Sequence, residues 1–288
     1  MKNLTWQNPE QLFVAQELIN KVKSKCCGIK GKYTIVIVQS LKDGDLKTGR
    51  ILYDDLSASL PVKYPDTAVK FYDLKNKPEL AEAFCKLYND IEDGELITLQ
   101  IEAHGCEDGI RLSSDELVTW KEFFGIIRPI NVRMKNLLLV CMSMCYGGAL
   151  ITHFEPEKRA PYRAFIGTGR EIKASVLLDG FAAFYENYHN LLDSFAAFEA
   201  LKKATIDPSI GGSPFWMMTS EEVFQKTLDP DRDPDNFKHM VNEQYVKQKV
   251  EGRDVTIEQV ATEIRELLNE SYKRYYENFT FRDLIPKA

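Results

Sequence analysis

Two apolar runs with the length of buried strands each lead to a residue that can do chemistry. Residues 96–103 (LITLQIEA) are followed by His104 and Gly105. Residues 137–144 (LLLVCMSM) are followed by Cys145. Parallel strands finish at one edge of a sheet, and α/β proteins place their reactive groups at that edge. The pattern therefore predicts that an imidazole and a thiol meet there.

Strand-like and helix-like runs alternate along the first part of the chain, which predicts parallel pairing with right-handed crossovers. The first predicted elements are a helix carrying Leu12, Ala15, Ile19 and Val22, a strand at 33–38, a loop at 40–49, a helix at 78–91 and the strand at 96–103. They are followed by a hairpin arm at 109–112 and a helix that a capping box at 113–116 opens and Pro129 ends. The strand at 137–144, a helix from Gly147 and a strand at 163–167 complete this part of the chain.

Beyond Gly169 the sequence is predominantly of helical type. Helices are predicted at 181–189 and 194–204, an edge strand at 214–218, a capping box at 219–222, a surface loop at 229–236, and a last long helix opened by residues 256–259. We expect one α/β domain at 1–224 and a helical C-terminal extension, 225–288, packed on it.

Composition narrows the function classes. The chain has 288 residues, 44% of them hydrophobic and 28% charged, with a formal net charge of −6. This balance is typical of a globular protein and argues against a nucleic-acid partner. No apolar stretch approaches the ~20 residues that span a bilayer, and the N-terminus lacks the apolar core of a signal peptide. Six cysteines in a chain this long do not indicate a disulfide framework. A cytoplasmic protein without membrane contact is expected.

The combination of His104 and Cys145 is the sequence feature most indicative of chemistry. A catalytic thiol attacks as thiolate, so it needs a proton acceptor and donors for the oxyanion that forms on the substrate. The backbone N–H groups of Gly105 and Cys145 are suited to that second task, and Gly147 and Gly148 would let a substrate backbone come close. A lone histidine or cysteine is more often structural, but the two strand-end motifs together favour a nucleophile with its acid or base.

A zinc site is the competing interpretation, because His104, Cys106, Cys141 and Cys145 are all zinc-ligand types. If 137–144 is a strand, Cys141 and Cys145 lie ~13 Å apart and cannot share one ion, whereas on a helix they could. We expect no metal and no cofactor.

The two motifs resemble those of the caspase-like cysteine peptidases, the group that includes caspases, metacaspases, legumains, separases and bacterial CHAT proteins. The residues that carry the resemblance are the strand into Glu102-Ala103-His104-Gly105 and the strand into Ser143-Met144-Cys145-Tyr146-Gly147-Gly148, within a similarity that extends over 33–224. It implies a three-layer sandwich with a mostly parallel central sheet flanked by helices. It also implies a His104–Cys145 dyad, with Gly105 and Cys145 forming the oxyanion hole.

The same resemblance implies a specificity pocket at the end of the first core strand and two positions before the cysteine. Those places hold Gln39, Ser40 and Ser143. Ser143 departs from the acidic or amide residue common there, so substrate preference stays open. Asp179 is a counterpart of a separase aspartate, although a helix N-cap is the preferred interpretation. Asp43 and Asp45 are interpreted as solvated loop residues.

Two departures from the caspase-like peptidases argue against regulation by proteolytic processing and by calcium. Only residues 153–162 separate the cysteine region from the next strand, so no processing segment is predicted there. Residues 229–236 alternate aspartates like a calcium loop, but Pro234 stands at the glycine position and Met240 replaces the closing glutamate, which argues against calcium.

The expected function is that of a cysteine endopeptidase that cleaves a protein or peptide substrate through a thioester acyl-enzyme. A bacterial stress or defence pathway with a regulatory protein partner is the expected setting. The alternative is a catalytically silent caspase-like interaction module, whose aromatic surface would comprise Trp216, Tyr272, Tyr275, Tyr276 and Phe279. Such residues at helical spacing are more often core.

Overall fold

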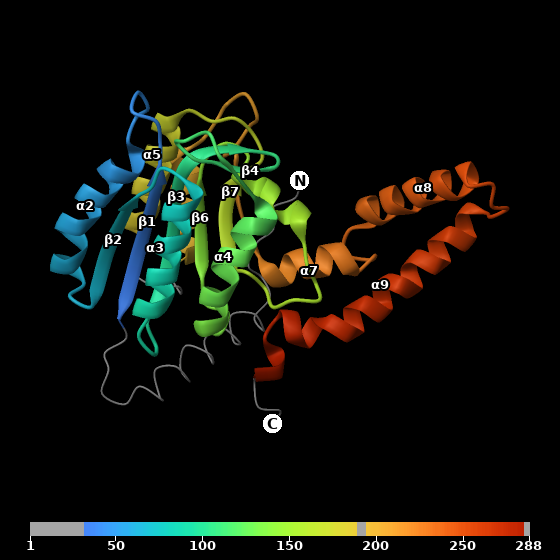
Figure 1. Cartoon of the computed structure of the whole chain (residues 1–288). Coiled ribbons are helices and arrows are strands. Elements are labelled where there is room, and N and C mark those ends of the chain that lie inside the picture. Colours follow the sequence, from blue (N-terminus) through green and yellow to red (C-terminus); the bar gives the residue numbers. More distant parts are fainter. Residues whose placement is uncertain (1–31, 189–193, 285–288) are drawn as a thin grey trace. The chain divides into compact units, whose positions relative to one another are not determined.

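The computed structural model describes residues 32–188 and 194–284 (Figure 1). The helix predicted around residues 12–22, and Cys26, Cys27 and His189, lie outside the described residues. The described residues divide into two compact units, the first formed by 32–153, 161–188 and 194–218 and the second by 154–160 and 219–284. The expected boundary at 224/225 instead falls inside helix α7 (Ser220–Leu228).

A mostly parallel mixed sheet forms the centre of the first unit. Its main path runs in the order β2-β1-β3-β6-β7-β8, and β4 and β5 form an antiparallel arm on β3. The strands are β1 (Tyr33–Ser40), β2 (Thr67–Asp73), β3 (Leu96–Cys106), β4 (Gly109–Arg111), β5 (Leu117–Thr119), β6 (Leu139–Ser143), β7 (Ala164–Thr168) and β8 (Phe215–Thr219). The β1–β2, β1–β3, β3–β6 and β6–β7 pairs are parallel. The predicted core strands, hairpin arm and edge strand are confirmed.

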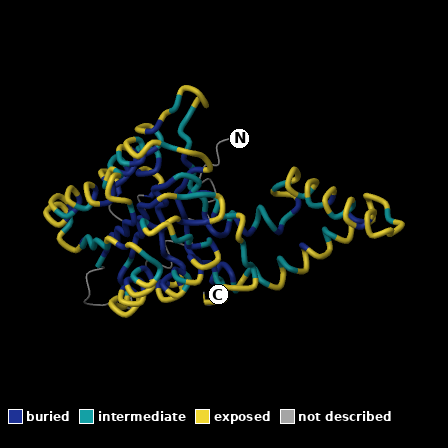
Figure 2. Tube along the Cα trace, turned by 45° about the horizontal axis from the view of Figure 1, so that its top comes forward, coloured by how far each residue is buried: buried dark blue, intermediate teal, exposed yellow. Residues whose placement is uncertain are grey.

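Helices flank the sheet on both faces. Figure 1 shows α3 (Lys77–Asp90) and α4 (Trp120–Arg133) in front of the strands and α5 (Ala174–Glu186) behind them. Helices α2 (Thr48–Lys63), α5 and α6 (Ser194–Ala204) share a hydrophobic core with alternate residues of β1, β6 and β7. Figure 2 shows that the buried residues are concentrated in this sheet. The predicted α/β class, with a mostly parallel sheet between helices, is confirmed.

The helix predicted from 113–116 to Pro129 has different ends. Residues 113–116 form the turn between β4 and β5, where Asp115 has a φ of 69°. The capping box lies at Thr119 and Glu122, each accepting a hydrogen bond from the other's backbone. Pro129 lies inside α4 because the carbonyl it leaves unbonded belongs to the exposed Gly125, where water can replace the donor.

Three elements were not predicted, and one has a different form. Helices α2 and α8 (Pro234–Val250) and the strand β2 have no counterpart in the sequence analysis. The helix expected from Gly147 is a short 3₁₀ segment, η1 (Gly147–His153). The expected 229–236 loop ends early, because Asp233 caps α8 by accepting from the Asn236 N–H.

The second unit consists of α7, α8, α9 (Ile257–Phe279) and the 3₁₀ segment η3 (Arg282–Leu284). Its core is aromatic: Phe224, Phe279 and Phe281 are buried, and Tyr272 stacks on Tyr276 with ring centroids 5.0 Å apart. The tyrosines and Phe279 considered for a docking surface therefore pack into this core. No helix in the described part of the chain is long and apolar enough to cross a membrane.

Candidate active site

The ends of β3 and β6 lie side by side at the carboxyl edge of the sheet. The last paired residues of these two strands are Glu102 and Ser143. His104 and Cys145 each follow two residues later. The backbones remain in contact beyond the paired region, because a Cβ added to Gly105 would lie only 2.0 Å from the Cys145 carbonyl oxygen. The two strands therefore bring His104, which lies within β3 and pairs with Arg111 of β4, and Cys145, which follows β6, to the same edge of the sheet.

His104 is hydrogen-bonded to a loop carboxylate. Its Nε2 lies 2.8 Å from Oδ2 of Asp45, in the loop between β1 and α2. The hydrogen bond to His104 is the main cause of a lowered Asp45 pKa, and the Lys42 N–H, 2.8 Å from the same oxygen, acts in the same direction. The imidazole is half exposed. This bond fixes the ring orientation and leaves Nδ1 available for another partner.

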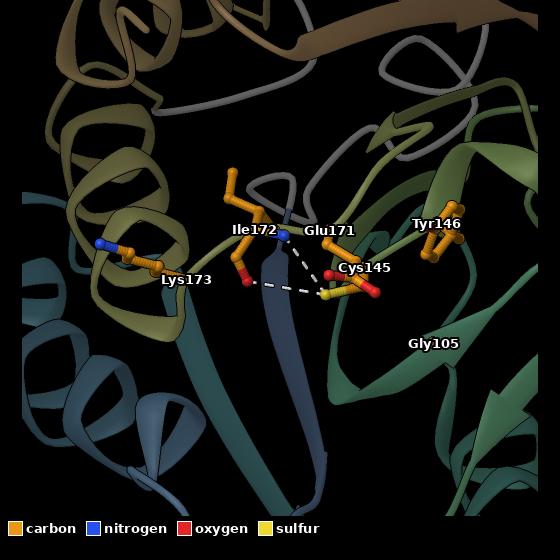
Figure 3. A pocket seen from close by; sticks show the side chains of 6 residues that line it. All are labelled: Gly105, Cys145, Tyr146, Glu171, Ile172 and Lys173. Atoms are coloured by element: carbon orange, nitrogen blue, oxygen red, sulfur yellow. Dashed lines mark hydrogen bonds between the residues drawn. The ribbon is translucent and has the colours of Figure 1, made fainter.

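The sulfur of Cys145 contacts the segment that leads into α5 (Figure 3). Sγ lies 3.4 Å from the Ile172 N–H nitrogen and 3.6 Å from the Ile172 carbonyl oxygen. The next residue, Tyr146, has a φ of 53°, and its N–H donates to the Arg170 carbonyl. A left-handed non-glycine residue directly after the sulfur is a conformation held in place by its surroundings.

A pocket of about 350 Å³ opens beside the sulfur. The residues that line it are Gly105, Cys145, Tyr146, Glu171, Ile172 and Lys173, and Figure 3 labels them and shows Ile172 facing the sulfur. Such a concave site next to a thiol is the size of a small side chain or a short peptide segment.

The glycines after Cys145 have a different neighbourhood from the one expected. A Cβ on Gly148 would lie 2.3 Å from the Trp216 ring. The ring of Trp216 also packs edge-on against Phe165, with centroids 5.2 Å apart. Gly148 therefore permits close packing of η1 against Trp216, rather than the approach of a substrate.

A second acidic group lies buried on β3, two residues before His104. Glu102 is 2% exposed and accepts hydrogen bonds from Thr48 Oγ1 at 2.6 Å and Gln100 Nε2 at 2.7 Å. Burial raises the pKa of Glu102 to about 7, although these hydrogen bonds oppose the rise. A Cβ on Gly49 would lie 2.9 Å from Glu102 Cγ, so only glycine lets the first turn of α2 come this close.

The specificity residues predicted from the sequence are spread over different surroundings. Gln39 and Ser143 are buried at the ends of β1 and β6. Ser40 is also buried, but its hydroxyl accepts from the Ser113 N–H at 2.9 Å on the side of the β4–β5 arm. Asp179 is exposed in the middle of α5, so it is not a helix N-cap, and it does not line the pocket beside Cys145.

The residues of the alternative zinc site are separated. Cys141 is fully buried within β6, where burial raises its thiol pKa, and Cys106 Sγ donates to the Gly109 carbonyl. Within residues 32–188 and 194–284, no three His, Cys, Asp or Glu side chains are grouped to hold a metal ion. Cys141 lies in the strand β6, so it and Cys145 are separated along an extended backbone rather than placed on one face of a helix.

Sequence reasoning missed the partnership of Asp45 with His104 and the burial of Glu102. A loop carboxylate 59 residues from its histidine leaves no local signal. For Glu102 a signal existed: Gln100, Glu102 and His104 recur at every second position of an otherwise apolar run. That period indicates one polar strip on one face of the strand.

Searches of the sequence against models of known protein families and against curated protein sequences gave no match.

Proposed function

We propose that the chain is a cysteine endopeptidase of caspase-like architecture, with His104 and Cys145 as its catalytic dyad. The observation that carries the proposal is the parallel register of β3 and β6, in which His104 and Cys145 each follow the last paired residues by two positions, with Gly105 and Cys145 lining one pocket. Thiol, imidazole and adjacent backbone donors are the parts that acyl transfer requires.

The reaction begins when the Cys145 sulfur, as thiolate, attacks a peptide carbonyl carbon. A C–S bond forms, and the backbone N–H groups of Gly105 and Cys145 stabilise the oxyanion. The C–N bond then breaks as the His104 imidazolium gives its proton to the leaving amine, which produces a thioester. Water activated by His104 hydrolyses the thioester and restores the thiol.

Asp45 acts in this mechanism as a positioning residue. By accepting from Nε2 it holds His104 in the tautomer whose Nδ1 serves as the base. The Ile172 backbone must release the sulfur before attack, since it contacts Sγ through both its N–H and its carbonyl. The proposed setting is a cytoplasmic one, with proteolysis of a protein partner under the control of a regulatory protein.

One observation favours the alternative, a catalytically silent interaction module. The imidazole bonds Asp45 and the thiol contacts Ile172, so each reactive group has a partner other than its dyad neighbour. Apo active sites often tighten only with substrate, so this geometry is compatible with both functions.

Thiol labelling distinguishes the two. Iodoacetamide and a set of peptidyl acyloxymethyl ketones are reacted with the intact protein, and modification of each cysteine is followed by mass spectrometry. We expect Cys145 to react with the ketones far faster than the exposed Cys85, which is the internal reference for an ordinary thiol. His104→Ala should remove this advantage. Equal, slow labelling of Cys145 and Cys85 would favour the silent module.

A further inference from the structure

Helix α2 begins without a cap from its own segment. The side chain of Lys47 at its N-cap cannot accept a hydrogen bond, and its first turn contains no Asp or Glu. The first N–H groups of a helix need acceptors, which residues of the same segment normally supply. Here an acceptor comes from the sheet, because Gln39 Oε1 on β1 accepts from the Arg50 N–H at 3.1 Å. The start of α2 is therefore fixed by tertiary contacts.

A second contact of this helix start is with Glu102 on β3. Thr48, the first residue of α2, donates its hydroxyl to Glu102 Oε2 at 2.6 Å. At the next residue, Gly49, a Cβ would lie 2.9 Å from Glu102 Cγ, so the helix backbone lies directly against this side chain. Thr48 and Glu102 are both buried. A hydrogen bond to a carboxyl group in the protein interior is stronger than one in water, so this pair holds the helix start on β3.

The loop before α2, residues 41–47, is stabilised by its own hydrogen bonds, and Figure 1 shows it at the upper end of β1. The Lys42 N–H donates to Asp45 Oδ2 at 2.8 Å, and the Asp45 N–H donates to the Lys42 carbonyl at 2.9 Å. The Lys47 ammonium donates to two carbonyl oxygens of the loop, at 2.6 and 2.7 Å. Because these bonds lie within the loop, a displacement of Thr48 at its end also displaces Asp45.

Strand β3 contacts the loop and the helix start at two points. Glu102 and His104 lie two residues apart, so their side chains share a face of the strand, about 6.6 Å from each other along it. The first accepts from Thr48, and Nε2 of the second lies 2.8 Å from Asp45 Oδ2. The imidazole is half exposed, and an exposed pair alone contributes little to holding a loop. The buried contact at Glu102 therefore determines where Asp45 lies.

Glu102 also contacts the strand that leads to the nucleophile. In the β3–β6 register it lies opposite Ser143, whose hydroxyl donates to the same carboxyl group. Cys145 follows Ser143 by two residues. The second carboxyl oxygen, Oε1, accepts from Gln100 Nε2 at 2.7 Å. One buried carboxyl group is thus bonded to α2, β3 and β6, and its donors fix its orientation.

We propose, on the basis of the proposed function, that Glu102 and Thr48 are positioning residues for the reaction. Their hydrogen bond places the loop at 41–47 so that Asp45 meets Nε2 of His104, and this keeps the imidazole in the tautomer that presents Nδ1 to the thiol. Both residues lie outside the pocket beside Cys145, so they act through Asp45 rather than on the substrate.

A matched pair at the opposite edge of the sheet supplies the control. There the buried Thr34 hydroxyl donates to the buried Glu95, directly before β3. The interaction is the same, a threonine hydroxyl on a carboxyl group, but it lies at the other end of β1 and β3 from the loop at 41–47. Thr34→Val and Thr48→Val each replace the hydroxyl with a methyl group of similar size.

Cleavage of a fluorogenic peptide separates positioning from folding. The constants kcat and KM are measured for the wild type, Thr34→Val, Thr48→Val, Asp45→Asn and the Thr48→Val/Asp45→Asn double variant. We expect Thr48→Val to lower kcat about fivefold with KM unchanged, since the loop moves while the substrate pocket stays. The double variant should be no slower than Asp45→Asn, because Thr48 acts through Asp45. Thr34→Val should keep the wild-type kcat.

The His104 ring gives a readout that does not need activity. Long-range nitrogen–proton NMR spectra of histidine-labelled protein report which ring nitrogen carries the proton, and the His104 signal is identified by its loss in His104→Ala. The neutral ring in the wild type should be protonated at Nε2, as the bond to Asp45 requires. Thr48→Val should populate the second tautomer, as Asp45→Asn does. Thr34→Val should not, and neither should Thr48→Ser, which keeps the hydroxyl.

The outcomes separate this inference from the proposed function. Equal losses of kcat in Thr34→Val and Thr48→Val would overturn the positioning role, and so would losses from Thr48→Val and Asp45→Asn that multiply in the double variant. An unchanged His104 tautomer in Thr48→Val would overturn it as well. If the wild type cleaves no peptide while Thr48→Val still changes the tautomer, the peptidase proposal fails and the positioning role stands. If Thr48→Val does not fold, Thr48→Ala replaces it with the same expected results.

Discussion

Two buried glutamates at opposite ends of β3 show how differently the two edges of the sheet are built. Glu95, directly before the strand, accepts from the Thr34 hydroxyl and from the Glu92 N–H, and so closes the turn that leads into β3. Glu102, near the other end, accepts from side chains, those of Thr48, Gln100 and Ser143. Both are at most 4% exposed.

The difference lies in what surrounds each carboxyl group. At the amino edge the acid is part of a local turn, and its hydrogen bonds serve the chain itself. At the carboxyl edge the acid accepts from side chains of α2, β3 and β6, and it lies two residues before an imidazole on the same strand. A buried carboxyl group whose pKa is raised beside reactive groups is characteristic of functional sites, whereas one that closes a local turn serves the fold.

Removing the sulfur at the carboxyl edge should have the largest effect. Cys145→Ala is expected to lower peptide cleavage by at least about 10⁴-fold, because no other group forms the thioester. Cleavage of a fluorogenic peptide measures this, and thermal unfolding checks that the fold is intact. Cys141→Ala, which removes a thiol buried in the sheet, should retain cleavage. Persistent activity of Cys145→Ala would exclude the proposed nucleophile.

Titration of Glu102 should change stability next most strongly. Its pKa is raised from 4.5 to about 7 by burial, so the folded state binds the extra proton between these values. The stabilisation that comes from protonating Glu102 in the folded state is complete below pH 4.5 and is lost as the pH rises through 7. The free energy of unfolding should therefore fall by on the order of 3 kcal/mol over this range. Denaturant unfolding of wild type and Glu102→Gln across pH 4 to 8.5 measures it. The stability of the wild type relative to the variant should fall with rising pH, and a constant difference would contradict the buried titration.

A methyl group at Gly105 should have a smaller effect on catalysis. In Gly105→Ala the added carbon meets the Cys145 carbonyl oxygen at 2.0 Å, so β3 and the nucleophile must separate. A displacement of about 1 Å costs ~100-fold in rate. Gly169→Ala is the control at the same edge, since its Cβ meets nothing within 4 Å. Peptide cleavage should fall only in the first variant; equal rates would mean that this contact does not position the sulfur.

The smallest effect is expected from Asp45→Asn. The amide still reaches His104 Nε2 but no longer selects the tautomer that presents Nδ1, so kcat should fall about tenfold with KM unchanged. The pH profile of kcat should shift as well, which a purely structural residue would not cause. Asp43→Asn, an exposed neighbour in the same loop, is the control. A change in KM alone would assign Asp45 to substrate binding instead.

The sequence revealed elements whose signal is strong in the chain itself. The runs before His104 and Cys145 are nearly all apolar, as expected of strands covered on both faces, and they were predicted correctly. The capping boxes at Thr219 and Thr256 also open helices as predicted. The same signature at 113–116 was misleading, because a Ser-x-x-Glu spacing fits a turn as well as a helix start.

Other features depend on contacts that the sequence does not display. In helix α2 the buried hydrophobic residues are three leucines, Leu52, Leu56 and Leu60, and Pro61 lies inside the helix. In α8 the buried residues are Val241 and Gln248. Neither helix therefore has the wide apolar face that makes a helix recognisable in a sequence. In the site, the placement of Asp45 on His104 and of Thr48 on Glu102 follows from tertiary structure. The placement of His104 and Cys145 at one edge of the sheet was therefore predictable, and their surroundings were not.

The parallel register of β3 makes the site intolerant of changes in strand length. One residue inserted between Leu96 and Ala103 would turn Glu102 and His104 together toward the α3–α4 layer and bring their apolar neighbours to the thiol. Two inserted residues would restore the facing but extend the strand by about 6.6 Å. Related sequences can therefore vary in the lengths of the loops at the sheet edges, whereas the number of residues from the start of β3 to His104 has to stay constant.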